Sequence, residues 1–140
     1  RIDTLDKEGL LRIIDYKTGK PHLEYRGIEG LFHGEANLRQ SNIINTLLYS
    51  MMLSREHNGR DVRPELYYVG SMVHSDYSPL FIEKIDRSSR TLNSYMQCAE
   101  EFEGEVHSTL REMFDSRVPF RQCEDEKGCE YCDYRTICRQ

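Results

Sequence analysis

The first nineteen residues constrain this chain most, because they set charged side chains into an apolar hairpin pattern. Two short apolar runs, at residues 2–5 and 10–14, flank the segment Asp6-Lys7-Glu8-Gly9. Three-residue hairpin loops commonly place a glycine in the left-handed conformation, so the pattern predicts a loop at residues 7–9, with Asp6 paired to Leu10. The chain therefore opens with two antiparallel strands.

This register predicts a cluster of two carboxylates and an amine. Asp3 would lie opposite Ile13 and share a face with Asp15 and Lys17, because side chains alternate along a strand. Diagonal neighbours across a strand pair are about 7–8 Å apart. Hard cations such as Mg²⁺ take oxygen ligands, and an adjacent amine can hold a phosphate oxygen. The pattern favours a divalent-cation site, although a hairpin whose Asp15 and Lys17 merely face water would show the same tripeptide.

These residues resemble two motifs of the PD-(D/E)XK nucleases, in particular the RecB/AddB-type branch. Arg1-Ile2-Asp3 is similar to the second motif, and residues 13–19, IIDYKTG, are similar to the third, D-x-K motif. The resemblance implies a restriction-endonuclease-like core that binds Mg²⁺ or Mn²⁺. It implies three catalytic residues, Asp3, Asp15 and Lys17, and three metal ligands, Asp3, Asp15 and the backbone carbonyl of Tyr16.

Residues 38–53 predict a helix, because apolar side chains recur at helical spacing through Leu47 and Leu48. Asn45 and Tyr49 lie four residues apart on an adjoining face, which by spacing alone reads as a polar shoulder beside the core. Nucleases of the RecB type carry Gln-x-x-x-Tyr on the helix after the D-x-K strand. By that resemblance Asn45, in place of the Gln, and Tyr49 face DNA, with Gln40 as a fallback.

The remaining pattern predicts a mixed sheet covered by helices. Strands are expected at residues 64–70 and 79–85, a polar loop at 71–78, and a second long helix at 92–114, in which Cys98 is a small buried hydrophobe. The expected class is α/β, a mixed β-sheet flanked by helices. Residues 1–118 would form a partial nuclease core that lacks its N-terminal part.

Residues 119–140 differ from the rest of the chain, because they are too polar to form an apolar core and contain four closely spaced cysteines. The spacing C-x5-C-x2-C-x5-C sets four possible ligands in a polar segment, and a C-x-x-C pair suits zinc or an iron–sulfur cluster. Spacing alone leaves zinc, iron–sulfur and free thiols open. The last three cysteines resemble the C-terminal clasp of AddB-type nucleases, which implies a four-iron four-sulfur cluster. The four candidates are Cys123, Cys129, Cys132 and Cys138.

The charge and length of the chain limit the functions that it can have by itself. The net charge is −5; residues 1–70 carry ten basic and ten acidic side chains, and residues 71–140 carry nine and fourteen. A duplex binder usually shows a basic footprint, so we expect other parts of a longer polypeptide to assist DNA binding. The chain begins without Met inside a strand, and no apolar run is long enough for a membrane span. We therefore expect a cytoplasmic fragment.

The expected function is metal-dependent hydrolysis of DNA phosphodiesters, within a bacterial helicase–nuclease or related repair exonuclease. The fragment itself would be inactive, since the family's upstream acidic residue or histidine is missing. Its partners would be DNA, the upstream part of its own polypeptide and a helicase subunit. Two alternatives are a non-catalytic nuclease-like module for DNA binding or assembly, and a zinc-ribbon interaction module formed by the tail.

Overall fold

The structure is a computed structural model that describes residues 1–4, 10–33, 37–119 and 132–138. The chain forms two compact units, Arg1–Val106 and His107–Gln140. Helix α3 (Ala99–Phe114) begins in the first unit and ends in the second. The domain boundary expected after residue 118 stays a prediction.

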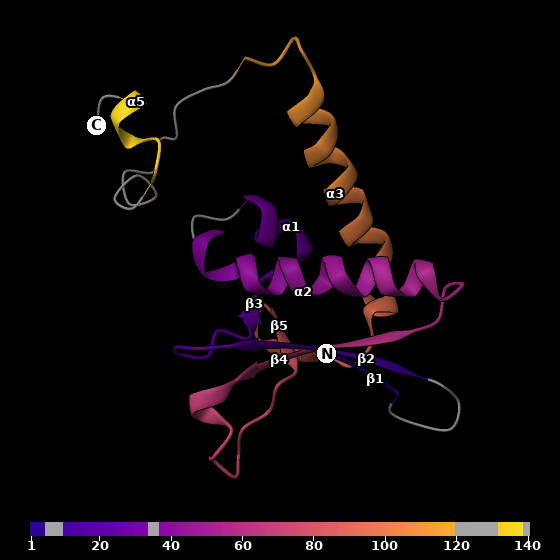
Figure 1. Cartoon of the computed structure of the whole chain (residues 1–140). Helices are drawn as coiled ribbons and strands as arrows, with labels where there is room; N and C mark the ends of the chain where they lie inside the picture. The colour runs from indigo at the N-terminus through magenta and orange to yellow at the C-terminus, as the bar shows by residue number, and fades with distance from the viewer. Residues whose placement is uncertain (5–9, 34–36, 120–131, 139–140) are drawn as a thin grey trace. The chain divides into compact units, whose positions relative to one another are not determined.

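A three-stranded sheet in the order β1-β2-β4 carries the hairpin (Figure 1). Strand β1 (Ile2–Thr4) pairs antiparallel with β2 (Leu11–Lys17), which in turn pairs in parallel with β4 (Val62–Tyr68). The sheet is therefore mixed, as expected. Strand β2 is its central strand; Leu11 and Ile13 on one face and Ile14 on the other are buried, and its remaining side chains are partly buried or exposed.

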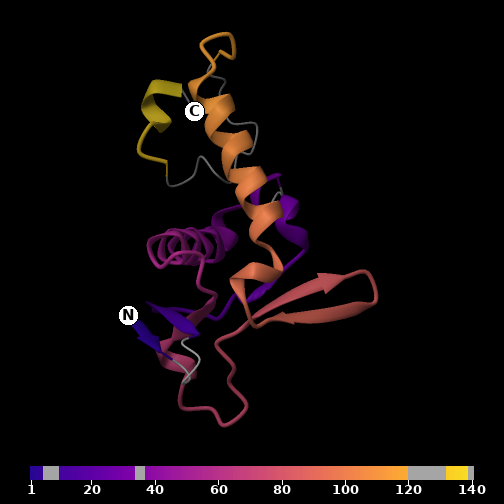
Figure 2. The ribbon, with the colours of Figure 1, turned by 90° about the vertical axis from the view of Figure 1, so that its right-hand side faces the viewer.

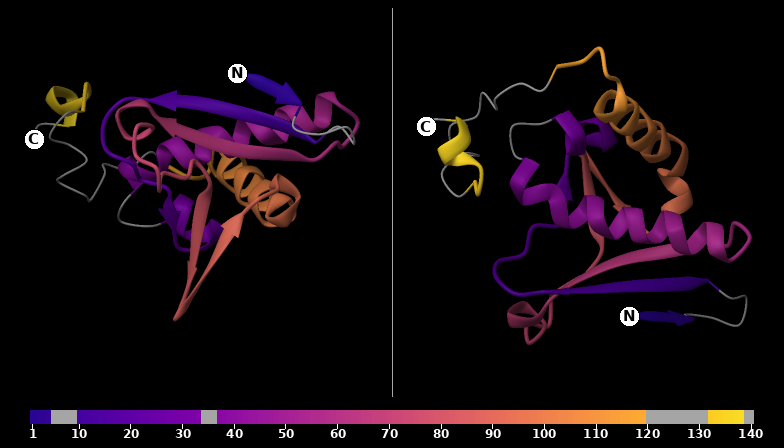
Figure 3. Two further views of the ribbon diagram at one scale, coloured as in Figure 1. Left: turned by 90° about the horizontal axis from the view of Figure 1, so that it is seen from below. Right: turned by 45° about the horizontal axis from the view of Figure 1, so that its top comes forward.

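Helix α2 (Asn37–Glu56) covers one face of this sheet, which we call the inner face (Figures 1 and 3). The helix buries one stripe of side chains against the inner-face residues of β2 and β4. Thr46 and Ser50 lie on that stripe at no exposure, and their hydroxyls donate to the carbonyls one turn earlier, at 2.8 and 2.9 Å. These bonds satisfy hydroxyls that burial would otherwise leave unpaired.

A second sheet, in the order β3-β5-β6, packs into the same core. Strand β3 (Glu24–Tyr25) leads into helix α1 (Gly27–His33), and strands β5 (Phe81–Ile85) and β6 (Ser88–Leu92) form a hairpin that Figure 2 shows clearly. Glu83 and Arg90 lie opposite each other in that hairpin, and the Arg90 guanidinium donates twice to the buried Glu83 carboxylate. This pairing supplies the partner that a buried charge requires.

Short helical turns and two ion pairs complete the first unit. The 3₁₀ turn η1 (Val69–Ser71) follows β4, and η2 (Tyr95–Gln97) precedes α3. Glu105 of α3 contacts His33 of α1 at 3.0 Å, and Glu103 contacts Arg55 of α2 at 2.6 Å. In the second unit, helix α5 (Arg135–Cys138) is a single turn.

The sequence predicted the main elements and misplaced others. The hairpin, the α2 helix and strands β4 and β5 are confirmed, with bounds shifted by up to three residues. The helix expected at 92–114 is wrong over its first seven residues, because Leu92 ends β6 and η2 intervenes before Ala99. Helix α1 has no counterpart among the predicted elements. Its buried Ile28 and Leu31 are too few to show a period in sequence.

Helix α2 offers a test of where the core lies. Leu47→Ala should lower the free energy of unfolding by about 2–5 kcal/mol, because it leaves a cavity under the helix. Met52→Ala on the same helix should change it by less than about 0.5 kcal/mol, since Met52 is 62% exposed. Urea titration followed by circular dichroism measures both; similar losses for the two variants would contradict the packing of α2.

Candidate active site

Asp15 and Lys17 end strand β2, and the structure brings their side chains together. The Lys17 Nζ and Asp15 Oδ2 atoms are 3.0 Å apart, and the two side chains are 27% and 21% exposed. In the parallel register Asp15 lies beside Leu66 and Lys17 lies beside Tyr68. Leu66 and Tyr68 are buried in the core. The ion pair therefore lies at the rim of the inner face, still within reach of solvent.

Helix α2 reaches this end of the sheet through Asn42, which the sequence analysis did not single out. The Asn42 amide donates to the Tyr68 hydroxyl at 3.5 Å, and Tyr68 is the neighbour of Lys17 on β4. Two residues earlier, the buried Gln40 Oε1 atom has no hydrogen-bond partner among the described residues. Asn42 could have been found as a polar side chain bordering the apolar stripe of α2.

Asp3 does not join the Asp15–Lys17 pair, so the expected cluster of three is wrong in this structure. Asp3 lies opposite Arg12 and not opposite Ile13. A shift of one residue turns a side chain to the other face of the sheet. Asp3 consequently lies on the outer face, where the Arg1 Nε and Arg12 Nη2 atoms donate to its two carboxylate oxygens at 2.9 and 2.8 Å.

Two sets of contacts account for this register. Arg1 and Ile14 exchange backbone hydrogen bonds of 2.9 and 2.8 Å, which sets residues 2–4 in step with β2. Both guanidiniums that bind Asp3 come from the outer face. The predicted loop at residues 7–9 lies outside the described residues, and the loop length was the assumption that set the predicted register.

The outer face holds a chain of charges. The Arg12 Nη1 atom is 3.7 Å from Glu65 Oε2, and Glu65 is 4% exposed. Hydrogen bonds from Arg12 and Arg1 lower the pKa of Asp3. Burial, reinforced by the charge of Glu65, raises the pKa of Tyr67. Arg12 is thus the ion-pair partner of the buried Glu65 carboxylate, while the Glu65 Oε2 atom has no hydrogen-bond partner among the described residues.

Asn45 and Tyr49 lie on the exposed side of α2, one turn apart. Tyr49 is 49% exposed. No recorded contact within residues 1–4, 10–33 and 37–119 links either side chain to Asp15 or Lys17. Their assignment to DNA binding stays a prediction.

The inner-face rim offers a minimal set of ligands for a divalent cation. Asp15 and the Tyr16 carbonyl are oxygen donors of the kind Mg²⁺ and Mn²⁺ take, and Mg²⁺ is often held by one or two carboxylates together with waters and substrate phosphates. Over the part of the chain that the structure describes, no group of three or more His, Cys, Asp or Glu side chains is placed to hold a metal ion.

The cysteines divide between described and undescribed residues. Cys98 is buried, as expected, and burial raises the pKa of its thiol to about 12. Cys132 is a free, partly buried thiol, and Cys138 belongs to α5. Cys123 and Cys129 lie outside the described residues, so the ligand set expected for the tail stays a prediction.

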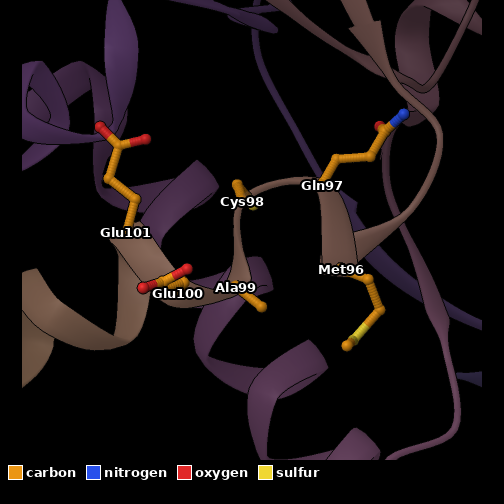
Figure 4. Close-up of a pocket in the computed structure, with 6 residues that line it drawn as sticks. All are labelled: Met96, Gln97, Cys98, Ala99, Glu100 and Glu101. Carbon is orange, nitrogen blue, oxygen red and sulfur yellow. The ribbon is translucent and has the colours of Figure 1, made fainter.

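None of the residues lining a cavity of about 450 Å³ is a predicted site residue. Residues 96–101 line it where η2 meets α3 (Figure 4). Cys98 has no role there as a nucleophile, because a thiol with so high a pKa stays protonated at neutral pH. The cavity offers no chemistry that would compete with the Asp15–Lys17 pair.

Comparison with known proteins adds one finding. A family model described as the PD-(D/E)XK nuclease superfamily matches residues 1–139. The curated proteins give no match to this chain. The solved structures give none either. Among the described residues, no helix is long and apolar enough to cross a membrane.

The outer-face position of Asp3 predicts a pH-dependent stability. Its carboxylate has a lowered pKa in the folded chain, so its stabilising effect is present above the ordinary Asp pKa of about 3.9 and is lost as pH falls through the folded value. Asp3→Asn should therefore be less stable than wild type at neutral pH, and the difference should vanish in strong acid.

Urea midpoints measured along a pH series test this. Asp76→Asn, which changes an exposed carboxylate in the loop after β4, is the matched control and should track wild type at every pH. An Asp3→Asn variant as stable as wild type at neutral pH would contradict the ion pairs on the outer face.

Proposed function

The chain belongs to the PD-(D/E)XK nuclease superfamily, and we propose that Asp15 and Lys17 form the part of a DNA-hydrolysing active site that the described residues contain. The observation that carries the proposal is the contact of 3.0 Å between Lys17 Nζ and Asp15 Oδ2 at the solvent-accessible end of β2. A carboxylate and an amine held together at the rim of a core are arranged for phosphate chemistry.

Each group has a distinct part in hydrolysis. Asp15 and the Tyr16 carbonyl would hold Mg²⁺ or Mn²⁺, which when bound supplies positive charge to the phosphate oxygens. Lys17 would exchange its contact with Asp15 for one with a phosphate oxygen and orient the attacking water. The water oxygen bonds to phosphorus and gives up a proton to solvent as the ester bond breaks, and the leaving sugar oxygen takes up a proton from solvent.

Asp3 takes a structural part in this proposal, because its carboxylate is occupied by Arg1 and Arg12 on the outer face. In the observed register, the position opposite Asp15 would be the residue before Arg1. We propose that the upstream part of a longer polypeptide supplies the further acidic residue or histidine that this site needs. The isolated 140 residues would then bind the cation weakly and cleave little DNA.

The substrate side rests on exposed residues of α2. Asn45 and Tyr49 are free to meet a DNA strand, and Tyr49 presents half of its side chain to solvent. The proposed setting is a bacterial helicase–nuclease of the RecB/AddB type, in which other segments supply the positive charge that this chain lacks. A non-catalytic DNA-binding or assembly module is the second candidate, favoured by the net charge of −5.

The four tail cysteines would hold a four-iron four-sulfur cluster in this setting, with zinc as the alternative. Protein purified without oxygen should be brown and contain iron and sulfide, because thiolate-bound clusters absorb visible light. A colourless protein with bound zinc would favour a zinc-ribbon module, and one with neither metal would reject both.

Titration with Mn²⁺ tests the proposed site. Wild type should bind the ion, Asp15→Asn should lose most of that binding, and Asp3→Asn, the matched control, should retain it, because only Asp15 faces the inner rim. Isothermal titration calorimetry gives the three affinities. Equal binding by wild type and Asp15→Asn would reject the site, and loss in Asp3→Asn alone would reject the register.

Cleavage by the longer polypeptide tests the role of Lys17. Lys17→Ala should lower the rate of DNA hydrolysis by about 10²-fold or more, the loss typical of removing one group that stabilises developing charge. Lys20→Ala is the control, since Lys20 is exposed and lies beyond β2. Gel assays with labelled DNA follow both rates. Full activity in Lys17→Ala would favour the non-catalytic module.

A further inference from the structure

Three tyrosine rings form a ladder on the outer face, and the proposed reaction uses none of them. The ring centres of Tyr16 and Tyr67 are 5.8 Å apart, and those of Tyr67 and Tyr77 are 6.4 Å apart. Tyr16 is 47% exposed, and the other two side chains are partly exposed. We call these three residues the tyrosine face. Tyr16 presents the most aromatic surface to solvent, whereas Tyr77 also packs against the hydrophobic core.

The far end of the tyrosine face is held in place by hydrogen bonds. The Tyr77 hydroxyl donates to the Leu66 carbonyl at 2.8 Å and accepts from the Tyr68 amide at 2.7 Å. Tyr77 thereby ties the loop after β4 back onto the strand. The same loop exposes two apolar side chains, Met72 and Val73, of which Val73 is 84% exposed. A ligand would find the rings already positioned, so little conformational entropy would be lost on binding.

The charge on the strands of the outer face differs in sign from that of the whole chain, while Asp76 adds a negative charge beside Tyr77. Three guanidiniums share the outer face, Arg1 and Arg12 beside Asp3, and Arg63 at the register position next to Arg12. Against Asp3 and Glu65, three positive and two negative charges leave a balance of +1, whereas the chain carries −5. The side chain of Arg1 is 64% exposed. A phosphate backbone is therefore better tolerated here than over the rest of the molecule.

We infer that the tyrosine face binds the bases of single-stranded DNA, by stacking on Tyr16 and along the ladder toward the apolar loop. Sequence-tolerant single-strand binding combines exposed aromatic rings with nearby cations, and this face has both. Duplex DNA would bind less well, because its bases are already stacked on one another. The inference rests on the proposed function, since Tyr16 adjoins Asp15 and Lys17 in the sequence, while its ring lies on the opposite face of the sheet from that pair.

Binding in EDTA tests the inference without cleavage or bound cation. The probes are a fluorescent oligothymidylate and a blunt duplex with the same label, followed by anisotropy at low salt. Wild type should prefer the single strand. Tyr16→Leu should bind the single strand about tenfold more weakly, the scale of one lost stacking contact. Tyr16→Phe, which keeps the ring, should bind as wild type does.

Tyr134→Leu is the matched control, because it removes a tyrosine of the second unit that is also exposed, at 68% against 47% for Tyr16. Circular dichroism verifies the fold of each variant. The inference is overturned if Tyr16→Leu binds the oligothymidylate as tightly as wild type, if the duplex is preferred, or if wild type binds neither probe. Binding of a second copy of the chain, seen by size-exclusion chromatography and lost in Tyr16→Leu, would identify a protein interface and also overturn it.

The proposed function is judged separately, by Mn²⁺ binding to Asp15. Wild type, titrated without DNA, should bind Mn²⁺, and Asp15→Asn should lose most of that binding. If Mn²⁺ binding follows this pattern while single-strand binding is equal in wild type and Tyr16→Leu, the tyrosine face fails and the proposed site stands. If Asp15→Asn binds Mn²⁺ as wild type does, the proposed site fails whatever the oligonucleotides show.

Discussion

The alternation of side chains along strand β2 is the constraint on which the rest of this structure depends. The strand is hydrogen bonded to β1 on one side and β4 on the other, and α2 covers its inner face. Leu11 and Ile13 must enter the core, so Asp15 and Lys17 follow them to the inner rim. Arg12 and Tyr16 must then lie on the outer face. One strand thereby carries an ion pair on one side and an aromatic ring on the other.

On the outer face, the alternation along β2 leaves charged side chains that require partners of opposite charge. Glu65 is buried there beside Arg12, and Asp3 is bound by two guanidiniums. A carboxylate in such a place is stable only when cations and hydrogen-bond donors accompany it. The same guanidiniums give the strands of the outer face their positive balance. The guanidiniums that accompany the carboxylates of the outer face are thus the same groups that favour the inferred binding of a nucleic acid strand.

Much of the fold was predicted from local sequence periodicity, and the elements that were mispredicted have physical explanations. Period-two and helical patterns located the hairpin, α2, β4 and β5, and a family model that matches residues 1–139 agrees with the expected nuclease class. The β6 strand was missed because Ser88, Ser89 and Arg90 are exposed and carry no apolar alternation. Its pairing with β5 depends on the tertiary contacts of Glu83 and Leu92, which local sequence does not reveal.

The sequence by itself determined that Asp15 and Lys17 share a face, because two residues on one strand keep their spacing in any register. It also determined that α2 would bury one stripe and leave Asn45 and Tyr49 outside. Only the tertiary structure decided where Asp3 points, because that depends on pairing between strands, and a slip of one residue reverses it. Backbone bonds between Arg1 and Ile14, and two guanidiniums around one carboxylate, made that choice.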